Sequence, residues 1–101
     1  MGYRLSPEAE TDLDDIWLFV ARESQNVSTA NRVIDTLMAR LWILGQHPQA
    51  GRRRDAELRA GLRSVAIGQY IVIYRVDEGD ALILHVMRGG RDTEELFADP
   101  N

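Results

Sequence analysis

Arginine side chains in the C-terminal third of this 101-residue chain are the groups best suited to chemistry. Arg63, Arg75 and Arg88 fall on segments that we predict to be strands, and Arg91 follows the last of these segments. Because an arginine on a sheet must reach water or an anionic partner, these side chains could share one cationic surface. The alternative is that they pair with acidic residues of the chain itself, such as those of the acidic helices or Asp77, Glu78 and Asp92.

General acid–base chemistry has few candidates in this sequence. The chain has no cysteine and two histidines, and all 12 basic residues are arginine, which keeps its proton. His85 lies on the last predicted strand and could act as an acid or a base, although ordinary strand packing is the alternative. His47 precedes Pro48 at a predicted helix end, where imidazole commonly binds the last carbonyl groups. We therefore predict no metal site and no cofactor.

Two amphipathic helices are predicted ahead of the strands. Ser6 and Pro7 start the first, with serine as N-cap and proline at the first helical position, and it stops near residue 24. The second begins around Ser28 and is ended by Gly45 and Pro48. The short link between them predicts an antiparallel helical hairpin. The buried stripes are Ala9, Leu13, Ile16, Trp17 and Val20, then Ala30, Val33, Ile34, Leu37, Met38, Leu41 and Leu44.

Three strands follow, at residues 62–67, 70–76 and 81–88, joined by tight turns. The first turn has the glycine-first pattern of a two-residue hairpin, and both faces of the middle strand are apolar, as in a central strand. With residues 3–5 as a short edge strand, we predict an α+β fold of order βααβββ, in which the helical hairpin covers one face of an antiparallel sheet. Asp92 to Glu95 resembles a capping box and predicts a short C-terminal helix.

Charge is distributed unevenly along the chain. Residues 36–91 carry nine arginines against five acidic residues, whereas acids outnumber arginines on both sides, and the net charge is -4. A basic centre between acidic ends indicates either a functional positive surface or ordinary solvation of acidic helices. The run Arg52-Arg53-Arg54 lies in a predicted polar loop and could contact phosphate, although such a run is more often simply solvated.

Length and composition bound the class of protein. A chain of 101 residues is expected to form one domain spanning residues 1–101. No apolar run approaches the roughly 18 residues needed to span a bilayer, so we expect no membrane contact. The N-terminus lacks the apolar core of a signal peptide and cysteine is absent, so we expect a cytoplasmic protein.

A series of short patterns resembles the ParE branch of the RelE/ParE toxin superfamily. They cover nearly the whole chain, and their combination with the predicted βααβββ order carries the resemblance. The patterns are Leu5-Ser6-Pro7-Glu8-Ala9, Asp12-Leu13, Ile16-Trp17, Pro48, Gly51-Arg52, Gly61-Leu62-Arg63-Ser64, Tyr70, Tyr74-Arg75 and Val86 to Arg91-Asp92.

The resemblance implies the toxin of a type II toxin–antitoxin module, a protein inhibitor of DNA gyrase that traps cleaved DNA. It implies neutralisation by a co-expressed ParD-like antitoxin, a ribbon-helix-helix protein whose C-terminal segment wraps around the toxin in a hetero-oligomer. The toxin itself would not bind DNA sequence-specifically. The expected target-binding residues are Arg63, Tyr70, Arg75, Arg88 and Arg91. The expected antitoxin-binding residues, on the helical hairpin and the sheet edge, are Trp17, Trp42, Ile43, Arg63 and Arg75.

Two of these antitoxin candidates have a simpler interpretation. Ile43 falls almost opposite the buried stripe of the second helix, and Trp42 falls on its flank. Exposed apolar side chains can mark a partner surface. They more often pack under the following loop, and we favour that interpretation for this pair.

The sister branch, which resembles RelE, offers an enzymatic alternative. RelE-like chains cut messenger RNA on the ribosome, which requires a base for the 2′-hydroxyl, an acid for the leaving oxygen and cations for the phosphate. In this chain the base would be His85, with Arg63, Arg75 and Arg88 on the phosphate. The chain has no lysine, and no tyrosine or histidine follows Arg91, so the sequence favours the gyrase inhibitor. A module that binds its antitoxin without being toxic is a third possibility.

The last predicted strand departs from the pattern of ParE-like chains. They often carry arginine and histidine where this chain has His85 and Arg88, so the two residue types are exchanged. Positions 85 and 88 face opposite sides of a regular strand. We therefore expect the exchange to move the cation to the other face of the sheet.

Overall fold

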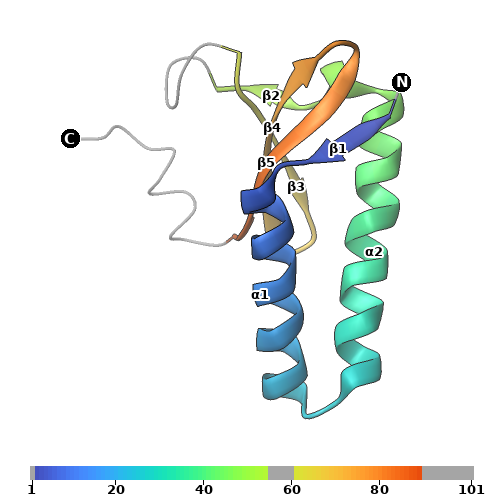
Figure 1. Ribbon diagram of the computed structural model, residues 1–101, viewed down its shortest axis with the longest axis vertical. Helices are drawn as coiled ribbons and strands as arrows, with labels where there is room; N and C mark the ends of the chain where they lie inside the picture. The colour runs from blue at the N-terminus through green and yellow to red at the C-terminus, as the bar shows by residue number, and fades with distance from the viewer. Residues whose placement is uncertain (1, 55–60, 90–101) are drawn as a thin grey trace, which may run out of the picture.

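The computed structural model describes residues 2–54 and 61–89, and its helical hairpin packs on a five-stranded sheet (Figure 1). The order of elements confirms the predicted α+β class, the helical hairpin and the three C-terminal strands. The C-terminal helix predicted at Asp92 to Glu95 lies outside the described residues. The elements are β1 (Tyr3–Leu5), α1 (Pro7–Ser24), α2 (Val27–Gln46), the 3-10 helix η1 (Pro48–Ala50), β2 (Arg52–Arg53), β3 (Arg63–Ile67), β4 (Tyr70–Asp77) and β5 (Asp80–Arg88).

The sheet has the order β1-β5-β4-β3-β2, so β4 is the central strand, as its two apolar faces predict. Both edge strands of the sheet differ from the prediction. β1 pairs with β5 in parallel, which makes the sheet mixed rather than antiparallel. Tight turns force neighbouring strands to be antiparallel, but every other element of the chain lies between β1 and β5, so no turn fixes the direction of β1. At the other edge, Arg52 and Arg53 form a two-residue strand beside β3 instead of remaining in a polar loop.

Local sequence signals account for the helix boundaries. The Ser6 side chain accepts a hydrogen bond from the Ala9 amide at 3.0 Å, as predicted for the N-cap of α1. Asn26 caps α2 in the same way, through the Thr29 amide at 3.2 Å. Gly45 was expected to end α2 but lies inside it. A β-carbon there would come within 2.5 Å of the carbonyl carbon of Gly2, so this glycine allows α2 to approach the N-terminal strand.

The core lies between the hairpin and one face of the sheet, here called the helix face. Most residues of both predicted stripes pack against it, and β4 contributes Val72 and Tyr74. Trp17 was predicted in the first stripe but is only half-buried and lies outside this cluster. Alternation along β4 puts Ile71, Ile73 and Arg75 on the opposite side, here called the far face. The remaining members of the buried cluster are Ala9, Leu13, Ile16, Leu37, Leu41, Leu44, Ile67, Ala81, Ile83 and Val86.

β5 contains a bulge that the sequence did not predict. Ile73 pairs with His85 while Tyr74 pairs with Ile83, so one extra residue stands in β5 at position 84. As a result Ile83 and Val86 both face the core although they are three positions apart. The register also places His85 opposite Ile73 and Arg88 opposite Tyr70. The two residues therefore lie on opposite faces, as expected from the pleat.

Tyr74 anchors the segment that follows α2. Its side chain is fully buried, and its hydroxyl donates to the Pro48 carbonyl at 2.7 Å and accepts from the Gly51 amide at 2.8 Å. Burial raises the pKa of this phenol above its ordinary value. A β-carbon at position 51 would collide with the Tyr74 ring. The Gly51 and Tyr74 patterns noted in the sequence are therefore two halves of one contact.

Candidate functional site

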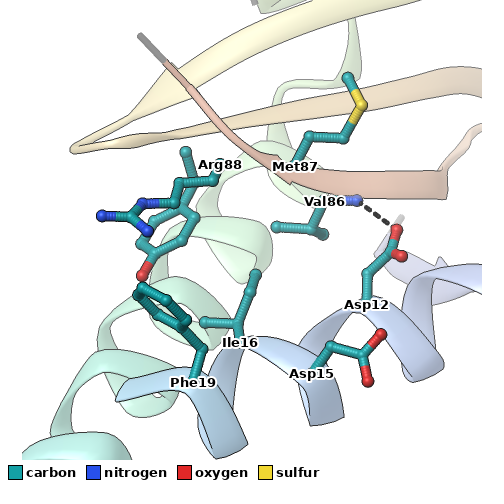
Figure 2. A pocket seen from close by; sticks show the side chains of 8 residues that line it. Asp12, Asp15, Ile16, Phe19, Val86, Met87 and Arg88 are labelled. Atoms are coloured by element: carbon teal, nitrogen blue, oxygen red, sulfur yellow. Dashed lines mark hydrogen bonds between the residues drawn. The ribbon is translucent and has the colours of Figure 1, made fainter. Parts of the chain in front are cut away.

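A groove between α1 and the end of β5 brings together two of the predicted target-binding residues, Tyr70 and Arg88 (Figure 2). We call it the α1–β5 groove. Its volume of about 290 Å³ lies at the small end of the ~300–1,000 Å³ typical of small-molecule sites, so it is suited to a side chain of a partner protein. The lining residues are Asp12, Asp15, Ile16, Phe19, Tyr70, Val86, Met87 and Arg88.

The groove forms where β5 extends past the end of β1. Without a neighbouring strand, the backbone groups on this edge need other partners, and the start of α1 supplies them. The Ser6 amide donates to the Ile83 carbonyl at 2.9 Å, and the Ser6 hydroxyl donates to the Leu84 carbonyl at 3.0 Å. Asp12 Oδ2 accepts from the Val86 amide at 2.9 Å. These contacts position β5 on α1 and so fix one wall of the groove.

Asp12 and Phe19 belong to this site although sequence reasoning assigned neither of them to it. Asp12 has the larger structural role. Besides the Val86 amide, its carboxylate contacts His85 Nδ1 at 3.1 Å. A signal was present, because Asp12 follows Ala9 by three residues and precedes Ile16 by four, which places it beside the buried stripe. An acid at such a position must find a hydrogen-bond donor on the packed element.

Arg88 and Phe19 form the other wall of the groove. The guanidinium carbon of Arg88 lies 4.4 Å from the centroid of the Phe19 ring, and Figure 2 shows both side chains on the same side of the groove. This is a cation–π distance. The Phe19 residue keeps 42% of its surface exposed. An aromatic ring and a cation held together at the surface, with Tyr70 beside them, are typical of a protein-binding hot spot.

The predicted common surface of Arg63, Arg75 and Arg88 does not form. Arg63 pairs with Tyr74 and Arg88 with Tyr70, which puts both on the helix face, whereas Arg75 alternates onto the far face. Arg63 is also engaged by the η1 segment. It donates to the carbonyls of Gln49 and Gly51 at 3.2 and 2.9 Å and to Gln49 Oε1 at 2.7 Å.

The remaining charged candidates are also distributed over the molecule. Arg75 is exposed, and the ion pair to Asp77 is formed by Arg4 instead, at 2.7 Å, with a second contact to Asp80 at 3.3 Å. The hydrogen bond from Arg4 lowers the pKa of Asp77. Arg91 lies outside the described residues.

His85 and the three arginines of the nuclease alternative do not converge. His85 shares the far face with Arg75 and is held by Asp12, whereas Arg88 is on the helix face and Arg63 binds the η1 segment. Within residues 2–54 and 61–89, the only side-chain hydrogen bond of His85 is the one to Asp12. The arrangement provides an oriented imidazole with one of the three arginines, Arg75, on its face of the sheet.

The aromatic candidates for antitoxin binding have different environments. The Trp17 indole donates to Asn31 Oδ1 at 2.8 Å and so links the two helices. Trp42 and Ile43 are 59% and 48% exposed, so the expectation that they pack under the following loop is wrong. The physical reason is that the loop is drawn to Tyr74 through Pro48 and therefore cannot fold back over α2.

In the part of the chain that the structure describes, no group of three or more histidine, aspartate or glutamate side chains is arranged to hold a metal ion. None of the described helices combines the length and the apolar character that crossing a bilayer requires.

Comparisons with known proteins agree with the fold. A family model described as ParE toxin of type II toxin-antitoxin system, parDE, matches residues 3–93. Toxin ParE1 of Caulobacter vibrioides is 40% identical over 74 residues, which is 73% of this chain and 75% of that protein. Toxin RelE3 of the same organism is 33% identical over 86 residues, 83% of this chain and 88% of the other. A solved structure titled Chromosomal ParDE TA system from P. aeruginosa superimposes with a TM-score of 0.76 at 21% identity, covering 89% of this chain and 97% of that one.

Proposed function

This chain belongs to the ParE toxin family of type II toxin–antitoxin systems, and we propose that it acts by binding and inhibiting DNA gyrase rather than as an enzyme. The observation that carries the proposal is the α1–β5 groove. It presents Phe19, Tyr70 and Arg88 together at the surface, which suits a protein partner. The groups that would have to cooperate in cleaving RNA are instead on different faces of the sheet.

A supercoiling assay with purified gyrase and relaxed plasmid tests this proposal. The protein should block supercoiling in the presence of ATP, and linear DNA should accumulate after the reaction is stopped with detergent and protease. Gyrase that is unaffected at micromolar toxin would refute the proposal.

The same assay tests the role of the groove. Arg88→Ala should weaken inhibition by about tenfold or more, the loss typical of truncating a central interface residue. Arg52→Ala is the matched control, because Arg52 is an exposed arginine of β2 at the opposite edge of the sheet. Equal effects of the two substitutions would mean that the contribution is one of general charge. The other predicted target-binding residues, Arg63, Tyr70, Arg75 and Arg91, should be compared in the same series.

We also propose that a ParD-like antitoxin neutralises this toxin by forming a hetero-oligomer with it. Family membership supports this partner, and so does the exposure of apolar side chains on α2. The antitoxin would carry the ribbon-helix-helix DNA-binding part of the complex. Co-expression of the neighbouring reading frame should yield a stable complex and restore growth. Failure of the two purified proteins to bind would refute the proposal.

The nuclease alternative is favoured by one observation, the contact of Asp12 with His85 Nδ1. A carboxylate that orients an imidazole is a common arrangement for a general base. His85→Ala should then abolish growth inhibition and messenger RNA cleavage. The gyrase proposal expects growth inhibition by this variant to remain. If expression without the antitoxin is harmless for the unaltered chain as well, the third possibility, a non-toxic antitoxin-binding module, is favoured.

A further inference from the structure

A second groove runs along the side of α2 that faces away from α1. Two adjoining cavities form this α2–β3 groove, and they share Arg40 and Ile67. Tyr70 at one end also lines the α1–β5 groove. The residues that line the α2–β3 groove are Arg32, Val33, Thr36, Leu37, Arg40, Ile43, Leu44 and His47 of the α2 region, Ala50 of η1, and Val65, Ala66, Ile67, Gly68, Gln69 and Tyr70 of the β3–β4 hairpin.

The floor of the groove is apolar, and one border is the outer edge of β3. β2 pairs only with Arg63 and Ser64, so among the described residues no strand covers β3 beyond Ser64. The Leu62 carbonyl accepts from the Arg54 amide on this edge. Alternation then directs the backbone groups of Ala66 to the same edge, and Ala66 is exposed. An uncovered strand edge beside an apolar channel is a typical docking place for a peptide segment.

The charge of the groove indicates what kind of segment it fits. The chain has 16 acidic residues against 12 arginines, yet the groove is lined by Arg32, Arg40 and His47 and by no acid. Within residues 2–54 and 61–89, Arg32 and Arg40 are exposed and make no hydrogen bond or ion pair. Two guanidinium groups without partners along an apolar channel match a segment with apolar residues on one side and carboxylates on the other.

The length of the groove sets the size of this segment. Arg32 and Leu44 are twelve helical residues apart, which corresponds to about 18 Å at about 1.5 Å per residue. This accommodates roughly twelve residues of a helix or roughly five residues of an extended chain at about 3.3 Å each. The uncovered part of β3 is too short for more than a brief pairing, so most of the contact would come from side chains in the channel.

We propose that the α2–β3 groove is where an acidic, amphipathic segment of the antitoxin docks, on a surface that adjoins the target-binding groove at Tyr70 and is otherwise separate from it. The inference rests on the antitoxin proposed above as partner. Of the residues predicted from sequence to bind antitoxin, only Ile43 lines this groove. Trp42 points to another side of α2, at about 100° per residue.

Two groove variants and one matched control test the inference. Ile43→Asp places a carboxylate in the channel, and Arg40→Glu reverses its charge; both positions are exposed, so the fold should tolerate them. Trp42→Asp makes the same kind of change at the neighbouring exposed apolar residue outside the groove. The probe is the purified ParD-type protein encoded beside this chain's gene, titrated calorimetrically, with thermal melts to verify folding.

Each groove variant should bind the antitoxin about tenfold or more weakly, while Trp42→Asp should bind like the unaltered chain. Both groove variants should inhibit gyrase as the unaltered chain does. If they bind the antitoxin with unchanged affinity, the groove is the wrong surface although the partner is right. If the unaltered chain does not bind the antitoxin, the proposed partner fails and the inference with it. Concentration-dependent self-association that Ile43→Asp abolishes, with antitoxin affinity unchanged, would assign the groove to a second copy of this chain and overturn the inference.

Discussion

Replacing Tyr74 by phenylalanine should destabilise the protein without changing the packing of the ring. The hydroxyl of Tyr74 bridges the Pro48 carbonyl at 2.7 Å and the Gly51 amide at 2.8 Å in a fully buried position. Tyr74→Phe leaves both backbone groups without this partner. A buried polar group that loses its hydrogen bond costs about 1–3 kcal/mol.

The expected change in melting temperature follows from the size of the chain. For a domain of roughly this length, 1 kcal/mol corresponds to about 4–8 °C, so Tyr74→Phe should melt roughly 5–20 °C lower. Tyr3→Phe is the control, because the Tyr3 hydroxyl makes no hydrogen bond within the described residues and its loss should be nearly neutral. Melting curves followed by circular dichroism at neutral pH give both values. A Tyr74→Phe variant that melts within about 2 °C of the unaltered chain would refute the reasoning.

The same side chain predicts a pH dependence with a definite sign. Burial raises the pKa of Tyr74 above its ordinary value of 10.0. Because the folded pKa exceeds the unfolded one, the buried neutral phenol contributes stability that is complete below about pH 10 and is lost as pH rises through the folded pKa. The stability difference between the unaltered chain and Tyr74→Phe should therefore be constant from about pH 7 to 9 and shrink above about pH 10. Urea denaturation from about pH 7 to above about pH 10 measures this stability difference. A difference that stays constant over the whole range would contradict the raised pKa of Tyr74.

Three further substitutions test other contacts by thermal or urea denaturation. Gly51→Ala should destabilise by about 1–3 kcal/mol, because the new methyl group collides with the Tyr74 ring; a neutral result would mean that the loop moves freely. Asp12→Ala should cost about 1–3 kcal/mol by leaving the Val86 amide without its acceptor, and Asp12→Asn, which keeps an acceptor oxygen, should recover part of that loss. Ser6→Ala should cost about 1 kcal/mol as an N-cap, and a Ser6→Gly variant as unstable as Ser6→Ala would argue against the capping role.

Sequence reasoning succeeded where the deciding interactions are local. The apolar stripes, the Ser6 cap and the glycine-first hairpin turn each depend on residues a few positions apart. The parallel pairing of β1 depends on contacts between Tyr3–Leu5 and β5, nearly eighty residues later, and no periodicity reports them. The short β2 strand is equally dependent on the position of β3.

The candidate site was predictable only in part, for a related reason. The alternation of side chains along a strand correctly placed His85 and Arg88 on opposite faces. Tyr70 and Arg88, two of the predicted target-binding residues, lie together in one groove. The prediction of a common arginine surface failed because the alternation of side chains along one strand does not give the register between strands. Arg63 pairs with Tyr74 rather than with Arg75, and this offset of one residue sends the two arginines to opposite faces.

The bulge in β5 has a consequence for how this strand can change in evolution. Residue 84 divides β5 into two halves. The first half is paired with β1 and the second is held by α1, so the facing of side chains is set separately in each half. Deleting that one residue would leave Ile83 and Val86 two positions apart, which is the spacing of neighbours on one face of a regular strand, so Arg88 would stay on the helix face opposite Tyr70. A gap of a single position at residue 84 is therefore compatible with the same two surfaces. Relatives that carry arginine and histidine in the opposite order should be compared with this chain by the face each residue occupies, and not by column alone.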